Sequence, residues 1–239
     1  MSKAKQPLLQ QHINGFLAVD RSIFNPFTHP VHRLYFTAMV TIWAICCRIH
    51  DVITDTGQHD PQKNVSRSNL KFLPNIEQPQ HVVIEVIGHK TRNFCARQGL
   101  IWKPKIIPRV DSCPFCPVLF LKLMIMNDPV PDSQASVTPL FRHAGGSPLL
   151  YRQLHSFIKD MMKRTGHNPD EYGTSSLRSG AATAASAIDG VSDNQLKNLG
   201  YWASNIFSRY TRIVESNYTE VVKQMLSKSS TSTVVDRVQ

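Results

Sequence analysis

Residues 30–53 read PVHRLYFTAMVTIWAICCRIHDVI and are apolar almost all round a helical circumference. The stretch predicts a buried helix that is entered through Pro30 and that the rest of the chain surrounds. With 239 residues, 41% of them hydrophobic, the protein can form a sizeable core. The longest apolar run, Phe36 to Cys47, contains two threonines and is shorter than the roughly 20 residues that a membrane-spanning helix needs.

A small antiparallel sheet is expected after this helix. Residues 54–80 are polar and predict a loop, with a short strand near 70–73. HVVIEVIGHKTR (81–92) is rich in β-branched residues and predicts a strand that runs into a turn at Gly88. GLIWKPKIIP (99–108) predicts the returning strand.

The remaining chain predicts mainly helices, so the expected fold class is mainly α with a small antiparallel β-sheet (α+β). A lead-in of residues 1–29, a main domain of residues 30–226 and a flexible tail of residues 227–239 are the expected divisions. The expected later helices are 114–127, 148–165, 177–188, 192–199, 203–214 and 218–227, with a proline-rich loop after the first of them.

The charge of the chain predicts anionic partners. Its 27 Lys+Arg and 17 Asp+Glu leave a formal net charge of +10. Nucleic acid is the first expectation and an anionic membrane surface the second. The N-terminus shows no apolar stretch typical of a signal peptide, and five cysteines without a disulfide pattern fit a reducing compartment, so an intracellular protein is expected.

The motif Cys113-Pro-Phe-Cys116 has two interpretations. Cys-x-x-Cys can be half of a zinc site, but no second such pair follows, and Cys95 and His89 would have to complete the ligands. The favoured interpretation is a turn at the start of a helix with buried thiols and no metal.

Arg48 lies near the end of the apolar helix, where a buried guanidinium requires an anionic or carbonyl partner. Asp51, three residues later, can supply one on the same helical face. Taken alone, this segment favours a structural pair between Arg48 and Asp51.

YGTSSLRSGAATAASAIDG (172–190) is more unusual. Ser175 or Ser176 can cap a helix whose first turn holds Arg178, and Gly180 with the alanines around it allows another backbone to approach closely. A cation in the first turn opposes the helix dipole, which a bound phosphate would compensate. The alternative is a solvated surface arginine.

The last informative segment contains Tyr210. Ile206, Tyr210 and Ile213 or Val214 share one helical face, so spacing alone favours a core tyrosine over a nucleophile. Arg209 and Arg212, taken singly, are a solvated basic face.

Together and in this order, these segments resemble the catalytic domain of the tyrosine recombinases, the phage integrase family, and especially the branch carried by retrotransposons and crypton-like elements. The resemblance covers roughly residues 30–215. DSCPFCPVLFLK and VTPLFRHAGGSPLL also resemble connecting segments of that branch. The four motifs that carry it are ICCRIHDVI with Arg48, IGHKTR with Lys90, SSLRSGAAT with Arg178, and LGYWASNIFSRYTR with Tyr210.

The resemblance implies DNA strand cleavage and rejoining in recombination or integration through a covalent phosphotyrosine. In that chemistry Tyr210 is the nucleophile, Arg48 and Arg178 neutralise the transition state, and Lys90 protonates the leaving oxygen. Neither a metal nor another cofactor is required. The implied partners are double-stranded DNA and further copies of the chain, as a tetramer on two duplexes, in the nucleus if the host is eukaryotic.

The sequence departs from the family pattern at three places. Ser175 stands where the family has a histidine, and Tyr201 stands where it usually has His, Trp or Arg. Residues 1–29 are too few for the separate helical domain with which these enzymes usually clamp DNA. The alternative function is therefore a catalytically impaired DNA-binding remnant of a mobile-element recombinase. A helical protein-interaction domain is the third possibility, and it leaves the positive charge unexplained.

Overall fold

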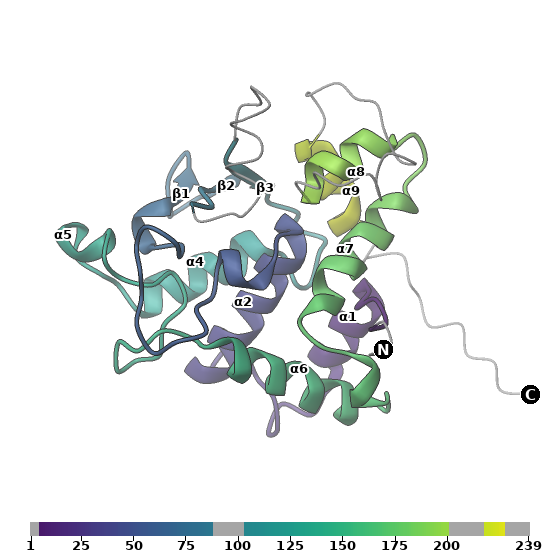
Figure 1. Ribbon diagram of the computed structural model, residues 1–239, viewed down its shortest axis with the longest axis horizontal. Coiled ribbons are helices and arrows are strands. Elements are labelled where there is room, and N and C mark those ends of the chain that lie inside the picture. Colours follow the sequence, from purple (N-terminus) through teal and green to yellow (C-terminus); the bar gives the residue numbers. More distant parts are fainter. Residues whose placement is uncertain (1–4, 88–102, 201–217, 228–239) are drawn as a thin grey trace, which may run out of the picture.

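The computed structural model describes residues 5–87, 103–200 and 218–227 (Figure 1). These contain eight α-helices and one three-stranded antiparallel sheet, which confirms the expected mixture of helices with a small sheet. The helices are α1 (Gln10–Ala18), α2 (Pro30–Ile45), α4 (Pro117–Asn127), α5 (Asp132–Ala135), α6 (Tyr151–Arg164), α7 (Ser175–Ser186), α8 (Asp193–Gly200) and α9 (Tyr218–Ser227). The strands are β1 (Leu70–Leu73), β2 (His81–Ile84) and β3 (Lys105–Pro108). Three short 3-10 helices are η1 (Ile49–Asp51), η2 (Arg67–Asn69) and η3 (Pro169–Glu171).

Helix α2 is the central element, as the sequence predicts. Pro30 occupies its first turn, and the His29 side chain caps it by accepting a hydrogen bond from the backbone N–H of His32. Helices α4, α6 and α7 and strand β3 all contact it, and Trp43 is fully buried. In the described part of the chain, no helix is both long enough and apolar enough to cross a bilayer.

The helix ends earlier than expected, at Ile45 and not near residue 53. Cys46 adopts a left-handed conformation, with φ 52° and ψ 32°, which stops the helix and turns the chain into η1. The apolar sequence continues through this point because Cys46, Cys47 and Ile49 are still buried in the core. Hydrophobicity therefore predicts burial correctly here but not the helix end.

The sheet has the order β1-β2-β3; β1 has the predicted bounds, and β2 and β3 lie within the predicted segments but are shorter. Leu70 pairs with Ile84, and Ile84 pairs in turn with Lys105. Val82, Ile84 and Ile107 are fully buried on the face that meets the helices. The turn predicted at Gly88 lies outside the described residues.

The N-terminal segment is part of the same core, although the sequence predicted only a lead-in there. Helix α1 and its flanks contribute Leu8, Ile13, Phe16 and Phe24, all buried. The backbone N–H of Leu8 donates to the carbonyl of Ser176 at 2.9 Å. Residues 5–29 therefore help to hold α7 against α2.

The later helices follow the prediction with shifted ends. Helix α4 starts at Pro117 instead of residue 114, and the proline-rich loop after it contains the short helix α5. Helix α7 starts two residues earlier than expected, at Ser175, whereas α9 has the predicted bounds. The helix predicted at 203–214 lies outside the described residues.

The two thiols of the Cys-x-x-Cys motif are buried, as the favoured interpretation predicts. Cys113 is 2% and Cys116 1% exposed, in the turn before α4. The Sγ atom of Cys116 accepts a hydrogen bond from the backbone N–H of Val110 at 3.4 Å. Within the described ranges no group of three or more metal-ligating side chains occurs, while Cys95 and His89 lie outside them.

Candidate functional site

Arg48 follows the left-handed turn at the end of α2 and precedes η1. Its side chain is exposed, whereas the sequence predicted a buried guanidinium on the helix. Its backbone N–H donates to Oδ2 of Asp51 at 3.0 Å. Asp51 thus caps the 3-10 turn, and the expected ion pair between these two side chains is not formed. The exposed guanidinium of Arg48 can meet an anionic ligand.

Arg178 comes from the first turn of α7 and is half-buried. Its Nη2 atom donates to the carbonyl oxygen of Gly200, the last residue of α8. Its own carbonyl oxygen accepts from Sγ of Cys46 at 3.6 Å, which joins α7 to the end of α2. Arg178 therefore joins α7 to α8 and to the end of α2 through its hydrogen bonds, and is not the solvated surface arginine that was its alternative.

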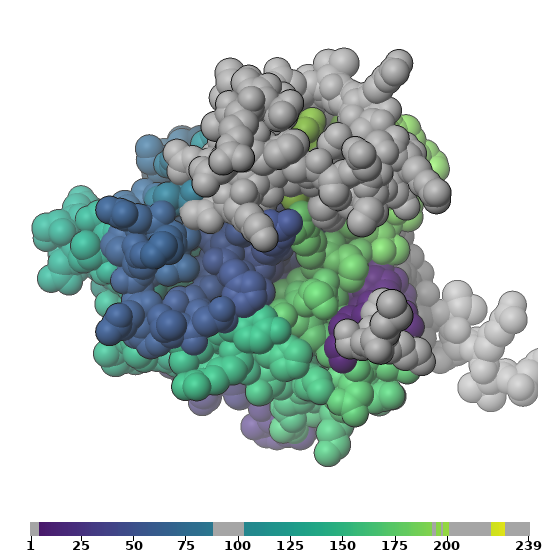
Figure 2. Space-filling view, viewed as in Figure 1, coloured from purple at the N-terminus to yellow at the C-terminus, as the bar shows by residue number. Residues whose placement is uncertain are grey.

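The two arginines are close enough for their charges to interact. Burial lowers the pKa of the Arg178 guanidinium, and the positive charge of Arg48 lowers it further, while Asp51 opposes this shift. The hydrogen bond from Cys46, two residues before Arg48, to the carbonyl of Arg178 likewise brings these two cations, far apart in the sequence, onto contacting elements of the fold. Figure 2 shows the segment around residue 50, in blue, meeting α7, in green, on one face of the molecule.

Ser175 is the first residue of α7 and is exposed. The prediction that Ser175 or Ser176 caps the helix is wrong, because Thr174 is the N-cap residue. The Oγ atom of Ser176 instead accepts a hydrogen bond from the backbone N–H of Gly173 at 3.1 Å. The hydroxyl of Ser175 is left at the helix start, one turn before Arg178.

Lys105 is a residue that the sequence analysis missed. It begins β3, is 2% exposed, and donates from Nζ to the carbonyl oxygens of Asn198 at 3.1 Å and Leu199 at 2.8 Å. Burial lowers the pKa of its ammonium group to about 7. The alternation of Lys105 with Ile107 on the strand is the sequence signal that places it on the buried face.

Three of the predicted site residues lie outside the described residues: Lys90, Tyr201 and Tyr210. The structure brings Arg48, Ser175 and Arg178 to adjoining elements. Lys105 binds the same end of α8 as Arg178 does.

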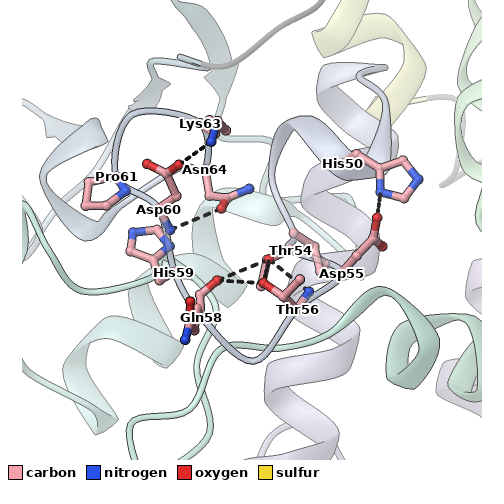
Figure 3. Close-up of a pocket in the computed structure, with 11 residues that line it drawn as sticks. His50, Thr54, Asp55, Thr56, Gln58, His59, Asp60, Pro61, Lys63 and Asn64 are labelled. Carbon is pink, nitrogen blue, oxygen red and sulfur yellow. Dashed lines mark hydrogen bonds and ion pairs between the residues drawn. The ribbon is translucent and has the colours of Figure 1, made fainter.

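A polar cavity of about 710 Å³ is lined by His50 in η1 and by residues of the loop that follows it (Figure 3). Its charged groups are paired within the loop. The Nδ1 atom of His50 lies 3.1 Å from Oδ2 of Asp55, and Nζ of Lys63 lies 2.7 Å from Oδ2 of Asp60. The cavity therefore offers hydrogen-bonding groups, but its lining includes neither Arg48 nor Arg178.

Comparison of the chain with protein-family models, with curated proteins and with solved structures finds no match. The function must therefore be argued from the residues of the site.

Proposed function

We propose that the protein binds duplex DNA and cleaves and rejoins its strands through Tyr210, in the manner of the tyrosine recombinases that its motifs resemble. The observation that carries this proposal is that Arg48 and Arg178 belong to contacting elements: the carbonyl oxygen of Arg178 accepts a hydrogen bond from Sγ of Cys46, two residues before Arg48. In agreement, the Arg48 charge lowers the pKa of Arg178. Like charges repel, so their placement together is typical of a site for an anion. A phosphodiester is the anion that suits a protein with a net charge of +10.

The chemistry balances without a nucleotide cofactor. The Tyr210 oxygen attacks the phosphorus, a bond to the 5′ oxygen breaks, and the strand remains attached as a phosphotyrosine. The tyrosine gives up a proton, and the leaving oxygen gains one from Lys90 in this proposal. Arg48 and Arg178 offset the negative charge that grows on the non-bridging oxygens. Rejoining is the reverse reaction with a 5′ hydroxyl of the partner strand, in a tetramer on two duplexes.

Ser175 favours the second candidate function, a DNA-binding remnant with impaired catalysis. Its exposed hydroxyl can donate one hydrogen bond to a phosphate oxygen, but it has no positive charge at any pH. The remnant would keep the basic surface and the affinity for DNA while it forms little or no covalent intermediate.

Incubation with nicked suicide duplexes, followed by denaturing electrophoresis, tests the proposal. The wild type should give a covalent protein–DNA band, and Tyr210→Phe should remove it without changing DNA binding or melting temperature. Tyr218→Phe is the matched control, because it removes the next phenolic oxygen along the chain, and Tyr201→Phe tests the other tyrosine of the predicted site.

The outcomes separate the three functions. An adduct that survives in Tyr210→Phe would assign the nucleophile to another residue. DNA binding without an adduct would favour the remnant. A protein that passes through heparin at low salt would instead be an interaction domain without DNA contact.

A further inference from the structure

Lys105 has no part in the proposed chemistry, yet its ammonium group is buried. Burying a cation is unfavourable unless its surroundings compensate it. Its Nζ atom donates to the carbonyl oxygens of Asn198 and Leu199, at the carboxyl end of α8. The last carbonyls of a helix have no partner inside the helix and carry the negative end of its dipole. Lys105 therefore caps α8 from a different element of the fold, strand β3.

Arg178 uses the next carbonyl in line. Its Nη2 atom donates to Gly200, so cations from β3 and α7 bind three successive carbonyls at one helix end. Helix α8 packs against α7, and β3 packs against α2. The carbonyl oxygen of Gly200, which accepts from Arg178, keeps its position only if the last turn of α8 keeps its own. Lys105 fixes that turn through its bonds to Asn198 and Leu199.

We propose that Lys105 is a positioning residue for Arg178. By holding the last turn of α8, it fixes the carbonyl that orients the Arg178 guanidinium. The positioning is a property of the described residues, whereas its consequence for DNA cleavage rests on the proposed function.

The charges around Lys105 make this hold sensitive to pH. Burial lowers its pKa to about 7, and the nearby charge of Arg178 also lowers it. Asp51 in η1 acts in the opposite direction, whereas the neighbouring thiols of Cys46 and Cys47 are uncharged near neutrality because burial raises their pKa. A neutral amine still donates hydrogen bonds but loses its attraction to the helix dipole. The hold on α8 should therefore weaken as the pH rises through neutrality.

Modification by phenylglyoxal, which reacts with accessible guanidinium groups, tests the proposal without DNA. Peptide mass spectrometry gives the rate at Arg178 relative to the rate at exposed Arg48, which serves as the internal reference. In Lys105→Met this ratio should rise about fivefold, as expected when the last turn of α8 loses roughly 1 kcal/mol of stabilisation by hydrogen bonds. The control is Lys223→Met, which makes the same change at an exposed position on α9 and should leave the ratio unchanged.

A pH profile separates positioning from a merely structural role. Between about pH 6 and pH 8.5 the wild-type ratio should rise as Lys105 loses its proton, and the Lys105→Met ratio should stay flat. A folded Lys105→Met protein with the wild-type ratio would overturn the proposal, and a wild-type ratio that does not vary with pH would overturn its pH dependence. If Lys105→Met does not fold, Lys105→Gln, which keeps amide donors, is judged by the same ratio. If neither folds, the lysine serves folding and the proposal fails.

The suicide-duplex assay then connects the result to function. If the wild type forms an adduct, Lys105→Met should form it more slowly with unchanged DNA affinity. An unchanged adduct rate would show that the position of Arg178 does not matter for cleavage and would overturn the functional part of the inference. If the wild type forms none, the proposed function fails while the phenylglyoxal ratio still judges the positioning.

Discussion

The carbonyl oxygen of Leu8 lies 1.9 Å from the point that a Cβ atom on Gly180 would occupy. The same oxygen accepts a hydrogen bond of 2.9 Å from the indole Nε1 of Trp43, so it cannot move away freely. The small residues of α7 thus allow the close backbone approach that the sequence predicted, and the partner is the N-terminal segment.

Gly180→Ala should therefore destabilise the protein, because a methyl group would overlap backbone that is held in place. The expected loss is about 1–3 kcal/mol or more in the free energy of unfolding, measured by urea denaturation. Gly57→Ala is the control, since nothing lies within 4 Å of the added Cβ. There the change should be less than about 1 kcal/mol. Equal effects at the two positions would contradict the close packing of Leu8 on α7.

Asp128, at the end of α4, forms ion pairs with two arginines, and its removal should destabilise the fold. Its carboxylate lies 2.6 Å from Nη2 of buried Arg67 and 2.7 Å from Nη2 of Arg142. Asp128→Asn should destabilise the fold by about 3 kcal/mol, because it leaves Arg67 buried without its counter-charge. Asp111→Asn, which removes the exposed partner of Arg109, should change stability by about 0.5 kcal/mol at most.

The ion pairs of Asp128 predict that the destabilisation caused by Asp128→Asn depends on pH. Burial opposes the ionisation of Asp128, but the hydrogen bonds and charges of Arg142 and Arg67 outweigh it and lower the pKa. A carboxylate with a lowered pKa stabilises the fold above its ordinary pKa of 3.8, and the contribution is lost as the pH falls through the folded-state value. The stability gap between wild type and Asp128→Asn should thus be constant well above pH 3.8 and shrink as the pH falls below that value. A gap that persists in acid would show that packing, and not charge, holds this site.

The burial of the thiols predicts that they react slowly with a disulfide reagent in the folded protein. Burial raises the pKa of Cys46 to about 12 and also raises that of Cys116. Both thiols should react with a disulfide reagent only after unfolding, because the thiolate is the reactive form. A metal chelator should leave the melting temperature unchanged, since the favoured interpretation of the Cys113–Cys116 motif is packing. One equivalent of zinc by elemental analysis would contradict it.

Duplex DNA binding should be weak, largely independent of sequence, and steeply dependent on salt. Each phosphate neutralised contributes about 0.9 to the slope of log affinity against log salt. Arg48→Ala should reduce the magnitude of that slope by roughly 1 and weaken binding to all sequences alike. The control is Arg21→Ala, because Arg21 stacks over Phe27 before the start of α2, whereas Arg48 follows its end. Nanomolar binding that is insensitive to salt would overturn this prediction.

The sequence predicts the composition of the fold better than the contacts of its site. The run at 30–53 predicts the central helix, and the β-branched residues of 81–92 predict β2, with 99–108 as its returning partner. The end of α2 is missed because the left-handed residue is Cys46, whereas glycine or asparagine usually signals that conformation. Helix α1 is missed because its N-cap is Leu9, which carries no capping side chain.

The role of Lys105 illustrates a different limit. Its place on the buried face follows from alternation, but its acceptors belong to α8, far along the chain, and no local pattern links the two. Arg48 and Arg178 were predicted as site residues from their motifs, and the structure adds that they approach each other. The roles of Lys90, Tyr201 and Tyr210 stay predictions, since these residues lie outside the described part of the chain.

Ser175 provides the test that separates an active recombinase from a remnant. An imidazole at this place could donate a hydrogen bond to a phosphate oxygen and carry a positive charge, whereas the serine hydroxyl offers only the hydrogen bond. The absence of one charge-stabilising donor commonly raises a barrier by about 2.7–4 kcal/mol, which slows a reaction roughly a hundredfold to a thousandfold. Part of this loss should be recovered by the hydroxyl, which is exposed at the first position of α7.

Ser175→His should therefore raise the rate of covalent adduct formation on a suicide duplex, and Ser175→Ala should lower it. Neither should alter the fold, because Ser175 is exposed and is not the N-cap of α7. Ser179→Ala, one turn further along α7, is the matched control for removing a hydroxyl, since its Oγ bonds back to the carbonyls of Ser175 and Ser176 within the helix. It should leave the adduct rate unchanged. If the histidine variant is no faster and the alanine variant no slower, Ser175 does not contact the phosphate, and the remnant becomes the better account of the protein.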